Sequence, residues 1–200
     1  MFFGNAVFLY FSAFIFNLGT NIFVTSYIPS LKDAYVSDST IFLMTLISVS
    51  AQTLVNFYVH KSSFFEQHKM FDRMLRILAL RAGSFLAAVG IAIFFQGNVF
   101  TVSSIILYSA IGVSLALYNT AISSLVLGTL SPRRQGMILG IYSALAGIFS
   151  FVGTFVSGYF SDSLNYFATF SFASFLMVVS LFLLSVSARK YKFRSLQVID

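Results

Sequence analysis

The amino-acid sequence predicts an all-α membrane protein with six transmembrane helices. Its 200 residues are 58% hydrophobic and only 9% charged, whereas about a quarter of the residues in a soluble domain are charged. Uncharged stretches long enough to cross a hydrocarbon core of about 30 Å follow one another along the chain. In addition, 11 of the 12 lysines and arginines would fall on one side of the membrane.

The first two spans are marked by the absence of charge. No charged residue precedes Lys32, and we expect the first helix over residues 5–28. It should end before Pro29, because the residue that precedes a proline is disfavoured in the helical conformation. The next uncharged run predicts the second helix over residues 39–59.

The third and fourth spans are separated by a turn. Only 14 uncharged residues, 82–95, lie between Arg81 and the turn signal at 96–98, which is too short to cross the membrane. The third helix is therefore predicted over 72–95, so that it includes Arg76 and Arg81. Gln96, Gly97 and Asn98 form a turn signal, and the fourth helix should cover 99–128.

The fifth span starts at a clear helix-start signal. Ser131 can cap a helix and Pro132 suits its first position, which predicts a helix over 132–160. Small residues recur every three or four positions along it and form a stripe on one face. Such a stripe is typical of close helix–helix packing in lipid. Its members are Gly136, Gly140, Ser143, Gly147, Ser150, Thr154 and Gly158.

The sixth helix is expected over 166–187 and completes a bundle that occupies residues 1–187. A basic tail, 188–200, follows it. Basic residues are enriched in the cytoplasmic loops of membrane proteins. The 11-to-1 split of basic residues therefore predicts a multi-pass protein of the cell membrane with both termini in the cytoplasm.

Three short segments resemble motifs of the major facilitator superfamily of transporters. FDRMLR at 71–76 is similar to the Asp-Arg-x-Gly-Arg signature of a cytoplasmic loop, with Leu75 in the glycine position. SPRRQG at 131–136 is similar to the entry of the fifth helix of a family half. GTFVSG at 153–158 resembles the Gly-Pro-x-x-Gly-Gly signature of family antiporters, although Thr154 and Ser157 replace its Pro and second-last Gly.

The resemblance is to the C-terminal half of such a transporter. Asn5, Phe8 and the segment 26–31 are similar to the start and end of the family's seventh helix, and the fourth span lacks the arginine found in N-terminal halves. The resemblance implies two inverted three-helix repeats, with the first, second, fourth and fifth helices around a cavity. It also implies a second six-helix half, either a separate chain or a second copy. The implied function is transport of a small solute by alternating access. A non-transporting membrane scaffold, or the relic of a truncated transporter, is the alternative.

Uncharged polar side chains inside the spans are candidates for solute binding. Amides are costly against lipid, so they should face protein or a watery cavity. They either contact solute or form interhelical hydrogen bonds, and as a set they favour neutral or amphipathic solutes. The candidates are Asn17, Asn21, Gln52, Asn56, Tyr118 and Asn119.

Charged residues at the third helix suggest further roles. The resemblance implies that Asp72, Arg73 and Arg76 belong to a gating loop that latches against the partner half; helix capping and local ion pairs are the alternative. Arg81 is expected to extend to the lipid headgroups, or else to pair across the bundle.

The sequence lacks the residues that most enzymes need. It has no Cys, and its two histidines, His60 and His68, fall in the predicted basic loop. No catalytic, metal-binding or cofactor-binding motif is present, so we expect neither an enzyme nor a bound metal or cofactor. The basic tail is expected to touch anionic lipid rather than nucleic acid.

Overall fold

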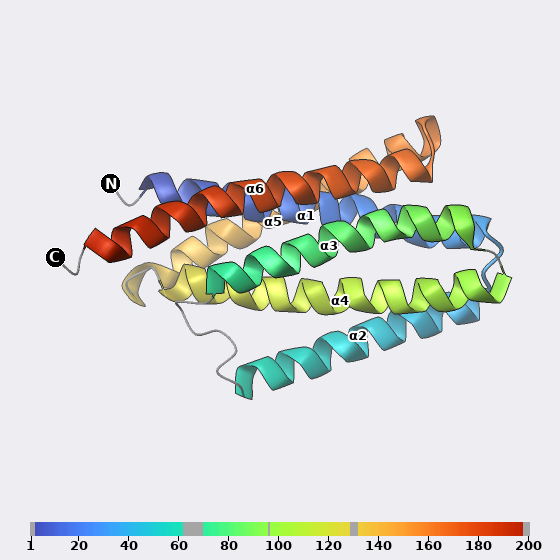
Figure 1. Ribbon diagram of the computed structural model, residues 1–200, viewed down its shortest axis with the longest axis horizontal. Coiled ribbons are helices and arrows are strands. Elements are labelled where there is room, and N and C mark those ends of the chain that lie inside the picture. The colour runs from blue at the N-terminus through green and yellow to red at the C-terminus, as the bar shows by residue number, and fades with distance from the viewer. Residues whose placement is uncertain (1–2, 62–69, 96, 129–131, 198–200) are drawn as a thin grey trace.

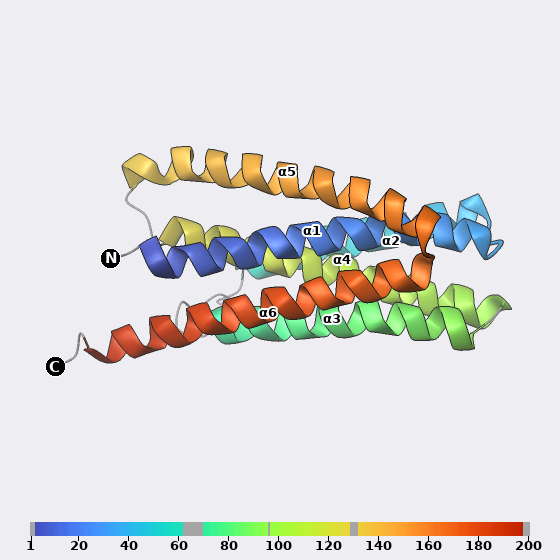
Figure 2. The same ribbon diagram turned by 90° about the horizontal axis from the view of Figure 1, so that it is seen from above.

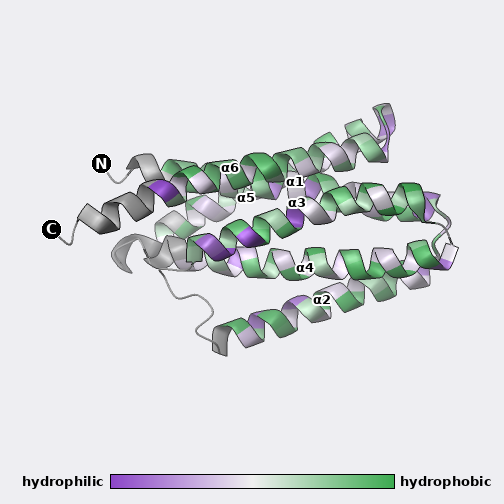
Figure 3. Cartoon of the chain, in the orientation of Figure 1, coloured by the Kyte–Doolittle hydropathy of each residue, from purple (hydrophilic) through white to green (hydrophobic). Residues whose placement is uncertain are grey.

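The computed structural model describes residues 3–61, 70–95, 97–128 and 132–197, which form six helices and no strand. Each helix is long and apolar enough to cross a membrane, which confirms the predicted all-α fold with six spans (Figure 1). Figure 3 shows hydrophobic residues along most of their length. The helices are α1 (Phe3–Asp33), α2 (Asp38–Lys61), α3 (Met70–Phe94), α4 (Gly97–Gly128), α5 (Pro132–Ser163) and α6 (Tyr166–Gln197).

Helix α1 does not end before Pro29, as the sequence suggested, but continues to Asp33. A proline removes only one backbone donor, and helical bonding resumes beyond it, since the Ala34 N–H donates to the Ser30 carbonyl at 3.1 Å. Membrane helices tolerate such a proline because neighbouring groups compensate for the lost bond.

A left-handed residue ends α1. Tyr35 has a φ of 59°, and its N–H donates to the Lys32 carbonyl at 2.9 Å. The N–H of Val36 donates to the Leu31 carbonyl at 3.0 Å. These two bonds are the Schellman arrangement that closes many helices.

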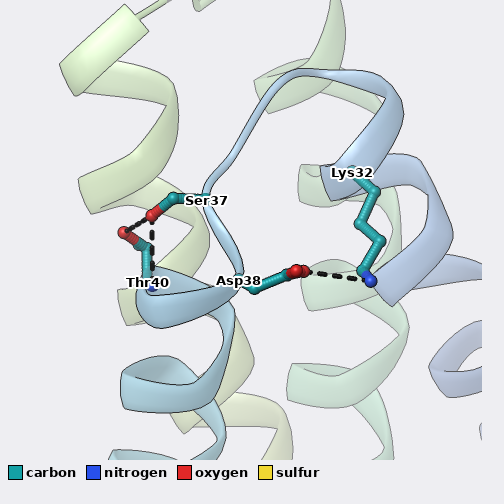
Figure 4. Close-up of polar contacts among 4 residues, drawn as sticks. All are labelled: Lys32, Ser37, Asp38 and Thr40. Atoms are coloured by element: carbon teal, nitrogen blue, oxygen red, sulfur yellow. Dashed lines mark hydrogen bonds and ion pairs between the residues drawn. The ribbon is translucent and has the colours of Figure 1, made fainter.

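Helix α2 starts at a capped N-terminus, shown in Figure 4. Ser37 Oγ accepts the Thr40 N–H at 3.3 Å and lies 2.9 Å from Thr40 Oγ1, as expected of an N-cap serine. Beside it, Lys32 Nζ and Asp38 Oδ1 form an ion pair at 3.0 Å.

The helices pack in a symmetric order. Each lies mainly against its neighbours in the series α5, α1, α6, α3, α4, α2 (Figures 1 and 2). If the labels α1 and α4, α2 and α5, and α3 and α6 are exchanged, the series becomes α2, α4, α3, α6, α1, α5, which is the original order reversed. Helices α1 and α4 run in opposite directions (Figure 2). Two three-helix units related by an inverted pseudo-twofold axis would pack in this way.

The two ends of the bundle differ in what they carry. Helix α1 begins and α6 ends at the same end, which we call the terminal end; the turns between α1 and α2, α3 and α4, and α5 and α6 lie at the distal end (Figures 1 and 2).

Helix α6 continues through 188–197, so this part of the predicted tail is helical. Its 32 residues span about 48 Å at 1.5 Å per residue, more than the ~30 Å core.

The core joins α1 to α3, α4 and α6. Phe23 stacks on Phe85 of α3 with ring centroids 4.1 Å apart. Ser12 and Ser180 each donate a hydroxyl to the other's backbone carbonyl at 2.8 Å. A Cβ at Gly19 would lie 3.2 Å from the Ala173 carbonyl oxygen, so α1 and α6 approach as closely as small residues allow.

Candidate functional site

Two of the candidate amides lie at the junction of α1 and α5. Asn21 Nδ2 donates to Ser150 Oγ at 3.0 Å and to the Asn17 carbonyl at 2.9 Å. Asn17 Nδ2 in turn donates to the Ala13 carbonyl at 2.8 Å. Both residues are half-buried. The Asn17 side chain also interacts with the Tyr142 hydroxyl of α5, whereas the amide oxygen of Asn21 accepts no hydrogen bond from a described residue and retains an acceptor for another ligand.

Two more amides lie at the junction of α2 and α4, which corresponds to the first under the exchange of labels. Asn56 Oδ1 accepts the Thr120 hydroxyl at 3.2 Å. Gln52 Nε2 donates to Ser48 Oγ at 3.4 Å, and both side chains crowd the space beside Gly112. The two junctions are therefore equivalent, although the amides lie on α1 in the first and on α2, the counterpart of α5, in the second.

The remaining two candidates, which are consecutive on α4, have opposite surroundings. Tyr118 is 0% exposed and stacks on Phe16 with centroids 3.7 Å apart, so it lies inside the bundle and not on a surface open to solute. Asn119 is exposed and makes no hydrogen bond to a described residue. An amide in this position within a span is unfavourable against lipid.

Six of the seven small residues of the predicted stripe on α5 face away from the rest of the described chain, whereas Ser150 accepts a hydrogen bond from Asn21 of α1. A Cβ at Gly136, Gly140, Gly147 or Gly158 would meet no atom within 4 Å, and Ser143 and Thr154 are also exposed. We call these six residues the α5 ridge. Within the described residues the ridge has no packing partner, so any helix that packs on it must come from elsewhere.

A second set of small residues, which shares Ser150 with the predicted stripe, holds α5 against α1, a role that the sequence did not indicate. A Cβ at Gly153 would lie 2.7 Å from the Leu18 carbonyl oxygen. The Ser26 hydroxyl bonds to Ser157, and the Ser161 hydroxyl donates to Ser26 at 3.0 Å. Residues 150, 153, 157 and 161 have the same helical spacing as the ridge, so spacing would have identified them as a second candidate stripe.

Arg81 lies in the centre of the bundle, and the expectation that it reaches the headgroups is wrong. It is 0% exposed. Its Nη1 donates to the Ile111 carbonyl and to Ser114 Oγ, both at 2.9 Å. The guanidinium carbon lies 4.8 Å from the Phe16 ring centroid and 5.3 Å from that of Phe85. No described acid pairs with it, and Nε and Nη2 have no hydrogen-bond partner. Helix α4 and two aromatic rings therefore hold the charge in place.

The residues of the predicted gating loop start α3 at the terminal end (Figure 1). Asp72 and Arg76 are exposed and Arg73 is half-buried. Asp72 lies in the first turn of α3, where a carboxylate favours the helix N-terminus, and no ion pair joins it to Arg76 among the described residues. Residues 62–69, which complete the predicted loop, and Ser131 lie outside the described residues.

Comparison with known proteins gives no family: no protein-family model, no curated protein and no solved structure matches this chain. Among the described residues, no group of three or more His, Cys, Asp or Glu is placed to hold a metal ion. The candidate site must therefore be interpreted from the geometry of this chain.

Proposed function

We propose that this chain is one six-helix half of a transporter of the major facilitator type, and that it moves a small solute across the cell membrane by alternating access. The observation that carries the proposal is the exposed α5 ridge. One face of α5 packs on α1, while its ridge of small residues lies open within a membrane span. A ridge of this kind allows close approach by another helix, a geometry that membrane proteins use for helix association.

The symmetric order of the helices supports the same proposal. Transporters built from inverted repeats place their substrate where the repeats meet. Here the corresponding junctions α1–α5 and α2–α4 carry the amides Asn17, Asn21, Gln52 and Asn56. A second six-helix half, from a separate chain or a second copy, would cover this face and enclose them. The basic residues Arg73, Arg76 and Arg189 near the terminal end favour a cytoplasmic location for both termini.

The polar groups favour an uncharged or amphipathic solute. Asn21 and Asn56 are half-buried. The amide nitrogen of Asn21 and the amide oxygen of Asn56 form hydrogen bonds to neighbouring helices, and the other polar atom of each amide has no hydrogen bond to a described residue. Neither polar atom of the Asn119 amide has one. These groups donate and accept hydrogen bonds without a net charge.

Solute binding is tested by thermal unfolding of the purified chain with a panel of small neutral and amphipathic compounds. A ligand that binds the folded state raises the unfolding temperature as its concentration exceeds the dissociation constant. We expect at least one compound to do so and to enter proteoliposomes that contain the chain. Asn119→Leu should reduce both effects, whereas Phe175→Leu on exposed α6 surface should not. If no compound shifted the unfolding temperature, solute transport would be contradicted.

A non-transporting scaffold is the second candidate, and one observation favours it. The amides of Asn21 and Asn56 already bond to Ser150 and Thr120 of neighbouring helices, as residues with a structural role would. A scaffold should associate with a partner through the α5 ridge yet show no uptake and no stabilisation by solute. The proteoliposome assay therefore separates the two functions.

A further inference from the structure

A cavity at the distal end lies apart from the junctions that carry the amides. It has a volume of about 190 Å³ and is lined by residues of α1, α3, α4 and α6. Tyr27 and Phe170, which are 3% and 1% exposed, form its buried part. Phe167, 41% exposed, lies on its open side. With Phe100 and Tyr166, five of the lining residues are aromatic.

One carboxylate belongs to the lining of this cavity. The Tyr166 hydroxyl donates to Asp33 Oδ2 at 2.8 Å, which links the end of α1 to the start of α6. The neighbouring Lys32 does not neutralise Asp33, because Lys32 pairs with Asp38 at 3.0 Å (Figure 4). No described residue forms an ion pair with Asp33. Asp162 lies close enough to Tyr166 to act on it electrostatically, so it adds a second negative charge nearby.

We propose that this cavity binds the ammonium group of an organic cation. The faces of aromatic rings carry negative potential and attract cations, and quaternary ammonium groups are commonly bound by several rings together. Asp33 supplies the formal negative charge that the aromatic rings lack. The volume is below the ~300 Å³ at which pockets for drug-sized ligands begin, so a compact group such as trimethylammonium is the appropriate size.

Other classes of ligand suit the cavity less well. Calcium and magnesium ions require six or more oxygen ligands, whereas the lining offers one carboxylate and is mostly apolar. An anion would be repelled by Asp33. The ammonium group has two possible sources, a free solute or a lipid headgroup, because the cavity lies at the end of membrane-spanning helices. This inference does not depend on the proposed transport function.

The test measures the binding of tetramethylammonium to the full chain in detergent by saturation-transfer NMR. The matched probe is tert-butanol, which has nearly the same shape and no charge. We expect tetramethylammonium to bind at least about tenfold more tightly, which corresponds to the contribution of a partly desolvated cation–π contact. Equal affinity for the two probes, or no binding of tetramethylammonium, would overturn the proposal.

Variants locate the site. Asp33→Asn keeps the shape and the acceptor for Tyr166 but removes the charge, and it should weaken tetramethylammonium binding about tenfold. Phe100→Leu should weaken it also. Asp72→Asn is the control, since it removes an exposed carboxylate that does not line the cavity and leaves the Lys32–Asp38 pair intact, and it should leave binding unchanged. An unchanged affinity in Asp33→Asn, or an equal loss in Asp72→Asn, would contradict the assignment.

Lipid composition distinguishes the two sources of the ammonium group. The binding measurement is repeated in nanodiscs of phosphatidylcholine and of phosphatidylglycerol. If phosphatidylcholine competes with tetramethylammonium and phosphatidylglycerol does not, a lipid headgroup occupies the cavity. Equal binding in both nanodiscs supports a free organic cation. Loss of binding in both would oppose the proposal.

Discussion

At the scale of single residues, Arg81 departs furthest from what the sequence predicts. Hydropathy shows that the charged Arg81 lies within a span, but it does not show which neighbouring helix supplies hydrogen-bond acceptors for the guanidinium. The structure places the guanidinium against the Ile111 carbonyl, Ser114 and two aromatic rings. A buried charge of this kind combines large packing volume with a high cost of desolvation.

Substitutions at Arg81 should separate volume from charge. Arg81→Ala removes a wholly buried side chain and should lower the free energy of unfolding by roughly 2–5 kcal/mol, because it leaves a cavity. Arg81→Met fills much of the space and avoids burying a charge, so it should cost far less. Denaturation in mixed micelles measures both. If Arg81→Met destabilised the protein as much as Arg81→Ala, the guanidinium contacts and not its volume would account for the stability.

A second residue-scale prediction concerns Tyr35, whose backbone is left-handed. Glycine adopts this conformation without the steric cost that a Cβ incurs. Tyr35→Gly should therefore raise the free energy of unfolding by about 1 kcal/mol, since the exposed side chain makes little packing contact. The control Tyr159→Gly, on the exposed side of helix α5, should lower it by about 1 kcal/mol. A loss of stability in Tyr35→Gly would show that the tyrosine side chain contributes more than its conformation costs.

At the scale of elements, the sequence located all six helices but misplaced some ends. Pro29 was expected to end α1, yet helical bonding resumes after it and Tyr35 closes the helix instead. Charge marked the tail from residue 188, but α6 continues because Lys and Arg are good helix formers outside the membrane. Boundaries read from charge thus record where the hydrocarbon core ends and not where the helix ends.

Helix α5 shows why helix pairing was harder to predict than helix position. Its sequence offers two stripes of small residues, one with Gly147 and one with Gly153. Both meet the spacing rule, and only the three-dimensional packing shows that Gly153 touches α1 while Gly147 is open.

The two glycines should respond differently to substitution. Gly153→Ala places a Cβ 2.7 Å from the Leu18 carbonyl oxygen and should cost about 1–3 kcal/mol of stability through overpacking. Gly147→Leu should leave the stability of the single chain nearly unchanged and weaken its association with a partner. Thermal unfolding under dissociating conditions measures the stability of the single chain in both variants. The size of the complex in lipid measures the association of Gly147→Leu with a partner. Equal destabilisation by both substitutions would mean that the ridge packs within the chain.

At the scale of the whole molecule, the composition and the positions of charge predicted the fold class, because the membrane sets the length and polarity of each span. The candidate residues fall into two kinds of surroundings. Asn21 and Asn56 lie at equivalent junctions, whereas Tyr118 is enclosed by the core. Polarity alone does not reveal which way a side chain faces, since a tyrosine is accommodated equally well in an aromatic core.

Disulfide cross-linking in the native membrane tests whether the α5 ridge meets a second six-helix half. The chain contains no cysteine, so single cysteines can be introduced without further changes. Gly140→Cys or Gly147→Cys on the ridge should form a disulfide with a second copy of the chain. If the second half is a different chain, a bifunctional reagent should join the introduced cysteine to it. Leu86→Cys and Phe175→Cys, on exposed faces of α3 and α6, should remain uncross-linked. Equal cross-linking at all four positions, or none at the ridge, would contradict the account.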